Sequence, residues 1–278
     1  NLEQLVIAPT VAVKFNQSHS VGISPLFGYQ RFSADGLQSF GAISTAPGNV
    51  TNQGHDSAKG WGVRVGWMGK LTDRLTLGAA YSSEIRMDKF DRYAGLFANG
   101  GDFDIPSNLS LGLAFQATPT LMLALDWQRI NYEDVPAVSN SSRSAGCMPG
   151  LTGGTGSTCL GGPSGLGFGW RDINVVKLGA QYKYNDKLTL RAGYNHGENP
   201  IRPEDITFNI LAPGVVRDHL TLGATYEVAP NSELTVAYMH AFKKSVTGPS
   251  DNPYFNTGGT EQIRMYQDSI GVAYSMKF

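Results

Sequence analysis

The sequence predicts an all-β protein, a transmembrane antiparallel β-barrel that forms a single domain over residues 1–278. Three observations support this fold class. Apolar residues alternate with small or polar residues along most of the chain, which is the two-residue period of a strand with unlike faces. The connections alternate between short polar turns and long loops. Charged residues make up only 16% of the chain, which is low for a soluble β protein but expected for a barrel in lipid.

The strands begin with Leu5 to Phe15, end with Asp268 to Phe278, and number about eleven. The same alternation recurs between these two in residues 75–81, 109–115, 121–127, 188–194 and 220–226. Bacterial single-chain barrels have even numbers of strands because both chain ends return to the periplasm, so we expect an odd number of strands upstream. The first residues, NLEQLVIAPTV, lack the basic and apolar regions of a signal peptide, so we expect this sequence to start inside a longer precursor.

Loop length distinguishes the two ends of the predicted barrel. Short links rich in turn formers occur at residues 16–18, 72–74, 118–120, 185–187 and 230–232. Long segments join the other strands, at residues 34–58, 88–106, 133–171, 196–217 and 243–265. Outer-membrane barrels have short periplasmic turns and long extracellular loops, whereas a soluble β-sandwich seldom separates its loops in this way. The sequence therefore favours the membrane barrel.

Aromatic residues on the strands predict the membrane interfaces, and we expect Trp61, Trp67, Trp127 and Phe278 in the aromatic girdles. The last strand ends on Phe278. A barrel strand can run to the chain terminus because all of its backbone groups pair with neighbouring strands. A terminal aromatic residue on such a strand resembles the signal that outer-membrane proteins present to their assembly machinery, which is therefore an expected partner. The alternative is an ordinary edge strand that ends on phenylalanine.

Composition and motifs argue against several function classes. The formal net charge is -1 and basic clusters are missing, which argues against a nucleic-acid partner. An enzyme would need a constellation such as Ser-His or Asp-His. His196 with Glu198 and Glu204 comes nearest, but no G-x-S-x-G motif accompanies it, so a solvated loop histidine is favoured. We therefore expect no enzymatic activity, no cofactor and no metal.

Cys147 and Cys159 are the only cysteines, and both lie in the longest loop. In an oxidising envelope compartment we expect them to form a disulfide that closes a small flexible loop. Their spacing alone does not resemble a four-ligand metal site.

Several segments resemble the FadL/TodX family of long-chain fatty-acid and hydrocarbon transporters from Gram-negative outer membranes. The resemblance is clearest in GWGVRVGWMGKLTDRLTLGAAYSSEIRMDKFDRY, in WRDINVVKLGAQYKYNDKLTLRAGYNHGENPI and in LTVAYMHAFKKS. It implies a multi-pass barrel of fourteen strands in the cell outer membrane, with an N-terminal hatch folded inside. The first strand here resembles the family's fourth. The hatch, which gates the family's barrels, and the kinked third strand thought to open a lateral exit would therefore precede this sequence.

The resemblance also implies where an apolar ligand binds. The family's collecting surface corresponds to two loops here, with Leu37, Phe40 and Ile43 in residues 34–58 and Phe90, Tyr93, Leu96 and Phe97 in residues 88–106. The stretch FDRYAGLF has apolar residues at helical spacing. A loop helix that packs on its neighbours is therefore as good an interpretation of this stretch as ligand contact.

Two arginines, Arg31 and Arg171, match basic positions that the family uses near the ligand head group. Arg171 has the parity of the lumen side. Plain alternation from Val21 and Ile23 places Arg31 on the lipid side, where a charge near mid-depth costs about 2–4 kcal/mol. A bulge near Pro25, or a position at the membrane rim, would remove this conflict. For each arginine, a structural charge at the rim or in the lumen is favoured over ligand contact.

The expected function is passive uptake of long-chain fatty acids or other hydrophobic compounds by a monomer that contacts outer-membrane lipid and lipopolysaccharide. Such a ligand needs an apolar collecting surface and a dry pocket with few polar contacts. Two alternatives stay open. A general polar-solute porin would have opposed rows of acidic and basic side chains, whereas the inward positions here are mostly Gly, Ala, Ser and Thr. An outer-membrane lipid-modifying enzyme would need the catalytic cluster discussed above.

Overall fold

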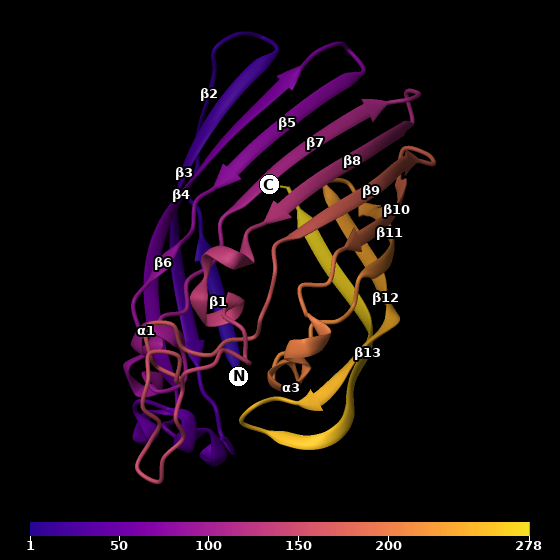
Figure 1. Ribbon diagram of the computed structural model, residues 1–278. Helices are drawn as coiled ribbons and strands as arrows, with labels where there is room; N and C mark the ends of the chain where they lie inside the picture. Colours follow the sequence, from indigo (N-terminus) through magenta and orange to yellow (C-terminus); the bar gives the residue numbers. More distant parts are fainter. Residues whose placement is uncertain (278) are drawn as a thin grey trace.

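The structure is a computed structural model that describes residues 1–277, and it contains one large antiparallel sheet (Figure 1). Hydrogen-bonded neighbours follow the order β1-β3-β4-β5-β7-β8-β9-β10-β11-β12-β13, with β2 beside β3 and β6 beside β4. The predicted antiparallel β fold is therefore confirmed. The expected interface residue Phe278 lies outside the described residues. Among residues 1–277, no helix is both long enough and apolar enough to span a membrane.

Consecutive strands pair with each other almost throughout, so the sheet is an up-and-down meander. The strands are β1 (Leu2–Ile7), β2 (Val11–Lys14), β3 (His19–Phe32), β4 (Asp56–Lys70), β5 (Leu75–Ser82), β6 (Arg86–Met87), β7 (Asn108–Gln116), β8 (Leu121–Ile130), β9 (Ile173–Lys183), β10 (Leu188–Gly197), β11 (Asp218–Ala229), β12 (Ser232–Asp251) and β13 (Asn256–Met276). β1 and β2 follow one another along the same side of β3. The sheet therefore has eleven strand positions, in agreement with the sequence prediction.

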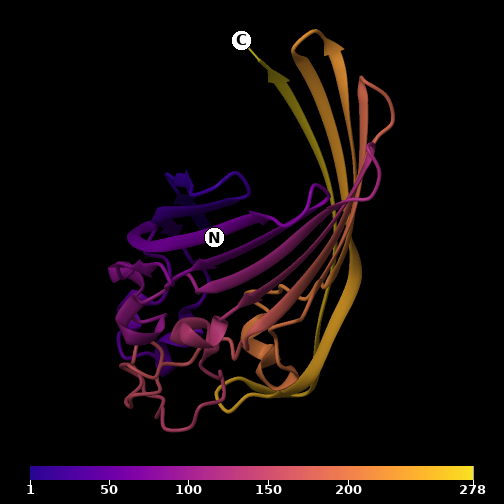
Figure 2. The same ribbon diagram turned by 90° about the horizontal axis from the view of Figure 1, so that it is seen from above.

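The sheet curves into an arc that is open between its two edges, β1 and β13 (Figure 2). Short turns gather at one end of the strands and the longer connections at the other (Figure 1). We call the connections at this second end the loop layer; it comprises the long connections at residues 33–55, 83–107, 131–172 and 198–217 and the short β12–β13 connection at residues 252–255. The layer contains short helical turns: η1 (Gln38–Ile43), η2 (Pro47–Asn49), η3 (Asp91–Tyr93), α1 (Ala98–Gly101), η4 (Tyr132–Asp134), α2 (Pro136–Ser139), η5 (Pro203–Asp205) and α3 (Ile206–Asn209).

Alternation along the strands gives the sheet an apolar outer face and an inner face of small residues. On β7, Leu109, Leu111 and Phe115 are exposed on the outer face. On the inner face, glycines of neighbouring strands lie opposite each other, as in the pairs Gly22–Gly66, Gly78–Gly112 and Gly179–Gly193. The inner face also carries some charges; for example, Asp126 of β8 lies opposite Lys177 of β9. The inner wall is therefore mostly free of bulky side chains.

One predicted loop is wrong, because residues 243–265 mostly continue β12 and β13 as a long hairpin whose connection is only residues 252–255. A register shift between Ala241 and Lys244 marks a bulge at the start of this extension. Polar residues and glycines make up most of the extension, so it lacks the apolar alternation that marks the other strands.

The segment FDRYAGLF does not form the helix that its spacing suggested. It holds only the short turn η3, and α1 behind it is broken by positive φ angles at Asn99 (55°) and Gly100 (76°). Gly95 lies against a neighbouring backbone, where a Cβ atom would sit 2.0 Å from the carbonyl oxygen of Ala46. This close approach explains a glycine in the middle of an otherwise apolar stretch.

Candidate functional site

A cavity of about 520 Å³ lies within the loop layer. Its walls come from the ends of β1 and β3 and from residues 34–40, 96–103, 137–138, 160–170 and 208–212. The volume falls in the range of cavities that hold small molecules. Its lining is mostly apolar and includes the aromatic residues Phe32, Phe40, Phe97, Phe103, Phe168, Trp170 and Phe208.

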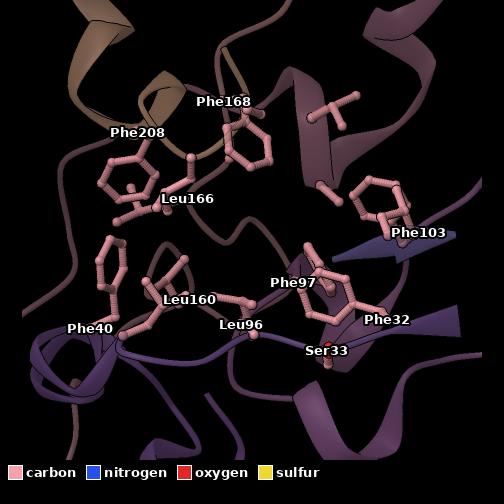
Figure 3. A pocket seen from close by; sticks show the side chains of 18 of the residues that line it. Phe32, Ser33, Phe40, Leu96, Phe97, Phe103, Leu160, Leu166, Phe168 and Phe208 are labelled. Carbon is pink, nitrogen blue, oxygen red and sulfur yellow. The ribbon is translucent and has the colours of Figure 1, made fainter. Parts of the chain in front are cut away.

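Aromatic side chains form two opposite groups in this cavity (Figure 3). In one group, the ring centroid of Phe97 lies 4.9 Å from that of Phe32 and 4.8 Å from that of Phe103. In the other, the rings of Phe40 and Phe208 meet edge-on at 5.4 Å. Such pairs contribute about 0.5–1.5 kcal/mol each beyond the area that they bury, so they hold the walls in a defined shape.

Four of the seven predicted collecting-surface residues line the cavity: Leu37, Phe40, Leu96 and Phe97. The other three, Ile43, Phe90 and Tyr93, are buried behind the wall, with exposed fractions of 3%, 0% and 0%. The Tyr93 hydroxyl donates to Gly54 O at 2.7 Å and accepts from the Ala34 N–H at 3.1 Å. The structure therefore gives Tyr93 a supporting role instead of a place in the cavity.

Arg31 does not face the cavity, which corrects the head-group position that the resemblance implied. The register of β3 and β4 runs without a shift from His19 to Phe32, so no bulge at Pro25 turns Arg31 inward. Arg31 is the next-to-last residue of β3 and lies opposite Glu3, with Nη1 3.9 Å from Oε2. A rim position on the outer face, one of the two explanations considered from sequence, therefore accounts for its charge.

Arg171 also lies away from the cavity. Its Nε donates to Asn199 O at 3.2 Å, and its side chain borders a polar surface groove with Glu133, Arg202 and Glu204. The structure thus brings neither predicted arginine to the aromatic walls.

The predicted interface tryptophans lie on the outer face of the sheet, Trp61 and Trp67 on β4 and Trp127 on β8. Trp61 is 71% exposed. Trp67 stacks on His19, with ring centroids 5.7 Å apart. Their place in an aromatic girdle stays a prediction.

Asn209, which the sequence analysis missed, holds one wall of the cavity. It is fully buried; its Nδ2 donates to Phe168 O at 2.7 Å and its Oδ1 accepts from Trp170 Nε1 at 2.6 Å. Phe168 and Trp170 both line the cavity. No sequence signal marks Asn209, because its partners lie about forty residues earlier in another loop.

Asp205, which the sequence analysis also missed, joins the loop of residues 198–217 to that of residues 131–172. Its side chain is buried (1% exposed), and its Oδ1 accepts hydrogen bonds from Ser141 Oγ at 2.7 Å, Ser142 N at 2.8 Å and Ser142 Oγ at 2.8 Å. A charged acceptor makes these bonds stronger than neutral ones. Asn252, in the β12–β13 connection, donates to Ser142 O at 3.0 Å, so a third loop joins the network.

The disulfide-closed loop is part of the same layer. Cys147 and Cys159 are joined in the structure, and residues inside and just after the closed loop dock on residues 34–58. Thr45 N donates to Leu160 O at 2.9 Å, and Gly154 N donates to Ser44 O at 2.8 Å. These backbone bonds place Leu160 in the cavity wall beside Phe40.

Two aspartates flank Phe103 at the edge of the cavity. Burial raises the pKa of Asp102 and of Asp104 above the ordinary carboxyl range. For Asp104, the Met87 N–H lowers the pKa through a hydrogen bond of 2.6 Å, while the neighbouring Glu84 raises it. Within residues 1–277, no three His, Cys, Asp or Glu side chains converge as metal ligands.

Comparison with known proteins gives a family match over the whole chain. The profile that matches residues 1–278 describes an "Outer membrane protein transport protein (OMPP1/FadL/TodX)". No curated protein matches the chain by sequence.

Solved structures share the fold. The toluene transporter TodX of P. putida is 20% identical, with a TM-score of 0.62 over 100% of this chain and 70% of that chain. The toluene transporter TbuX of Ralstonia pickettii is 17% identical, with a TM-score of 0.60 over 99% and 68%. A FadL homologue of Pseudomonas aeruginosa is 19% identical, with a TM-score of 0.65 over 98% and 67%. These identities are low, so the likeness shows the fold alone.

Proposed function

The chain belongs to the outer membrane protein transport protein family (OMPP1/FadL/TodX), and from this premise we propose that it admits small hydrophobic compounds through the outer membrane of a Gram-negative bacterium. The family is one of transporters and not of enzymes. The observation that carries the proposal is the aromatic cavity in the loop layer, which offers an apolar compound a binding place outside the sheet.

Binding in this cavity removes apolar surface from water, which stabilises a ligand by about 0.8 kcal/mol for each buried CH₂ group. From there the ligand moves toward the inner face of the sheet, where opposed glycines such as Gly78 and Gly112 leave the wall free of bulky groups. Transport is driven by the concentration gradient alone, without cofactor or energy input. Hydrocarbons are candidate substrates because TodX and TbuX are toluene transporters, and fatty acids are candidates because the family includes FadL.

We also infer the surroundings of the protein. Leu222, Val236 and Val272 are exposed on the outer face of neighbouring strands and form part of an apolar surface suited to membrane lipid. The loop layer would face lipopolysaccharide and the outside. Residues 1–278 would form one barrel domain, act as a monomer, and be inserted by the barrel assembly machinery.

The proposal is tested by uptake into cells that carry the full-length protein or its variants. Ala212→Trp places a large side chain on the cavity lining, and Ala145→Trp makes the same change at an exposed position outside it. We expect uptake of labelled toluene or dodecanol to fall several-fold for Ala212→Trp and to stay at the wild-type level for Ala145→Trp, at equal amounts of protein in the outer membrane.

Flux of a small polar sugar serves as the second readout. If the sugar enters faster through the wild-type protein while toluene and dodecanol uptake match cells without it, the protein is a polar-solute porin and the proposal is wrong. Equal uptake of toluene and dodecanol by Ala212→Trp and Ala145→Trp would show that the ligand does not pass through the cavity.

A further inference from the structure

The side-chain charge around the cavity is negative. Among residues 1–277, the residues that line it include one acidic residue, Asp35, but no lysine, arginine or histidine. The backbone nitrogen of Asn1, at the same rim, donates to the backbone oxygen of Ser33 at 2.7 Å. No ion pair among these residues involves Asp35.

Asp35 is held at the mouth of the cavity by its backbone neighbours. The Ala34 N–H donates to the Tyr93 hydroxyl at 3.1 Å, and the Gly36 N–H donates to Asn52 Oδ1 at 3.3 Å. Leu37, next along the chain, donates its N–H to Thr51 Oγ1 at 3.1 Å. These bonds hold the backbone on both sides of Asp35, so this exposed residue is kept at the cavity lining and does not move away with a free loop.

We propose that Asp35 is a specificity-determining residue through which the cavity selects neutral hydrophobic molecules over carboxylates of the same chain length. The inference rests on the proposed function, because it names the substrate class of that same cavity. It concerns charge only and applies equally to linear and aromatic compounds.

Both orientations of a fatty acid are unfavourable in this site. With the tail in the cavity, the carboxylate remains at the mouth beside Asp35. Like charges about 4 Å apart in a water-like medium weaken binding by roughly fivefold, and by more where the ligand excludes water. With the head group inside, the carboxylate would meet Phe97, Phe168 and other apolar groups without a cation, which costs more. A neutral alcohol or hydrocarbon avoids both penalties.

The matched probes are dodecanol and dodecanoate, which share a chain and differ in charge at about pH 8. Equilibrium binding to the purified full-length protein in non-ionic detergent is measured for wild type, Asp35→Asn and Asp35→Lys. Asp91→Asn is the control, since Asp91 is an exposed aspartate of the same loop layer that does not line the cavity. We expect wild type to bind dodecanol at least about tenfold more tightly than dodecanoate.

Dodecanoate affinity should rise about fivefold in Asp35→Asn and further in Asp35→Lys, because the first change removes a repulsion and the second adds an attraction. Dodecanol affinity should change less than about twofold in all variants, and high salt should shrink the dodecanoate differences. Asp91→Asn should match wild type with both probes. Equal dodecanoate affinity in wild type, Asp35→Asn and Asp35→Lys would overturn the inference.

The result for Ala212→Trp separates this failure from failure of the proposed function. If Ala212→Trp loses dodecanol binding while dodecanoate affinity is the same in wild type and both Asp35 variants, the cavity is the binding site and only the charge inference is wrong. If Ala212→Trp binds dodecanol as wild type does, the cavity is not the site, and both proposals fall.

Discussion

Replacing Asp205 by alanine should open the loop layer without disturbing the sheet. Asp205 is buried and accepts three hydrogen bonds on Oδ1, from Ser141 and from two groups of Ser142. Its removal leaves the backbone N–H and the hydroxyl of Ser142 buried without their acceptor, and Ser142 is itself 0% exposed. The strands would keep their own ladder, because no strand hydrogen bond depends on Asp205.

The expected cost follows from these contacts. A hydrogen bond to a charged group contributes about 1.5–3 kcal/mol, but the three bonds share one oxygen and are not additive. Each buried donor of Ser142 left without an acceptor costs about 1–3 kcal/mol, so for the two donors we take about 3–5 kcal/mol. This corresponds to a rise of about two to four orders of magnitude in the population of opened loops. Asp205→Asn keeps an acceptor oxygen but not the charge, so it should fall between wild type and Asp205→Ala.

Native-state hydrogen exchange and limited proteolysis in detergent measure this opening. The control is Glu204→Ala, which removes the adjacent but exposed carboxylate. Asp205→Ala should expose residues 131–172 and 198–217 to exchange and cleavage, while amides of β10 and β11 stay protected. Cleavage rates that match those of Glu204→Ala would refute the argument that this buried acid joins the loops.

Two further predictions concern the same layer. The double variant Cys147→Ser/Cys159→Ser should lose about 2–4 kcal/mol of local stability and be cut faster between residues 148 and 158, with unchanged cleavage elsewhere as the internal check. It should also bind dodecanol more weakly, since Leu160 beside Cys159 lines the cavity. Burial raises the pKa of Asp104 above its ordinary value of 3.8 in the folded loops. The contribution of Asp104 to loop stability should therefore be greatest in acid and fall as pH rises from that value through the raised pKa, because the unfolded chain releases its proton first. Asp104→Asn should flatten this dependence of proteolysis rate on pH, and a slope unchanged by the substitution would contradict the assignment.

Strand pattern was predictable from sequence where one face is apolar. Residues 109–115 alternate leucine and phenylalanine with small side chains, and β7 has that alternation between its two faces. The outer halves of β12 and β13 were mistaken for a loop because most of their residues are polar or glycine, and the few apolar ones, such as Val246 and Ile263, pack on the loop layer. The two-residue period therefore carries little hydrophobic signal there. An alternation of apolar and polar residues does not mark strands that extend beyond the apolar part of a sheet.

The cavity was only partly predictable. Phe40 and Phe97 were found because the family resemblance pointed to their loops. Phe168 and Phe208 were missed because their position depends on contacts between distant segments, such as Asn209 with Phe168 O. Arg31 shows the value of the plain pattern: its match to a basic position of the family suggested a ligand contact, whereas the alternation of β3 placed it on the outer face, where the structure has it.

The way the loops are tied together limits how such a protein can be altered. Leu160 is bonded to Thr45, Asn99 to Gly162, and Ser142 to both Asp205 and Asn252. Replacing a single loop by that of a relative would leave hydrogen-bond donors and acceptors of the remaining loops without partners. Chimeras of this protein should therefore exchange the whole loop layer or none of it. Relatives that acquire a new ligand preference should show correlated sequence changes in several loops at once.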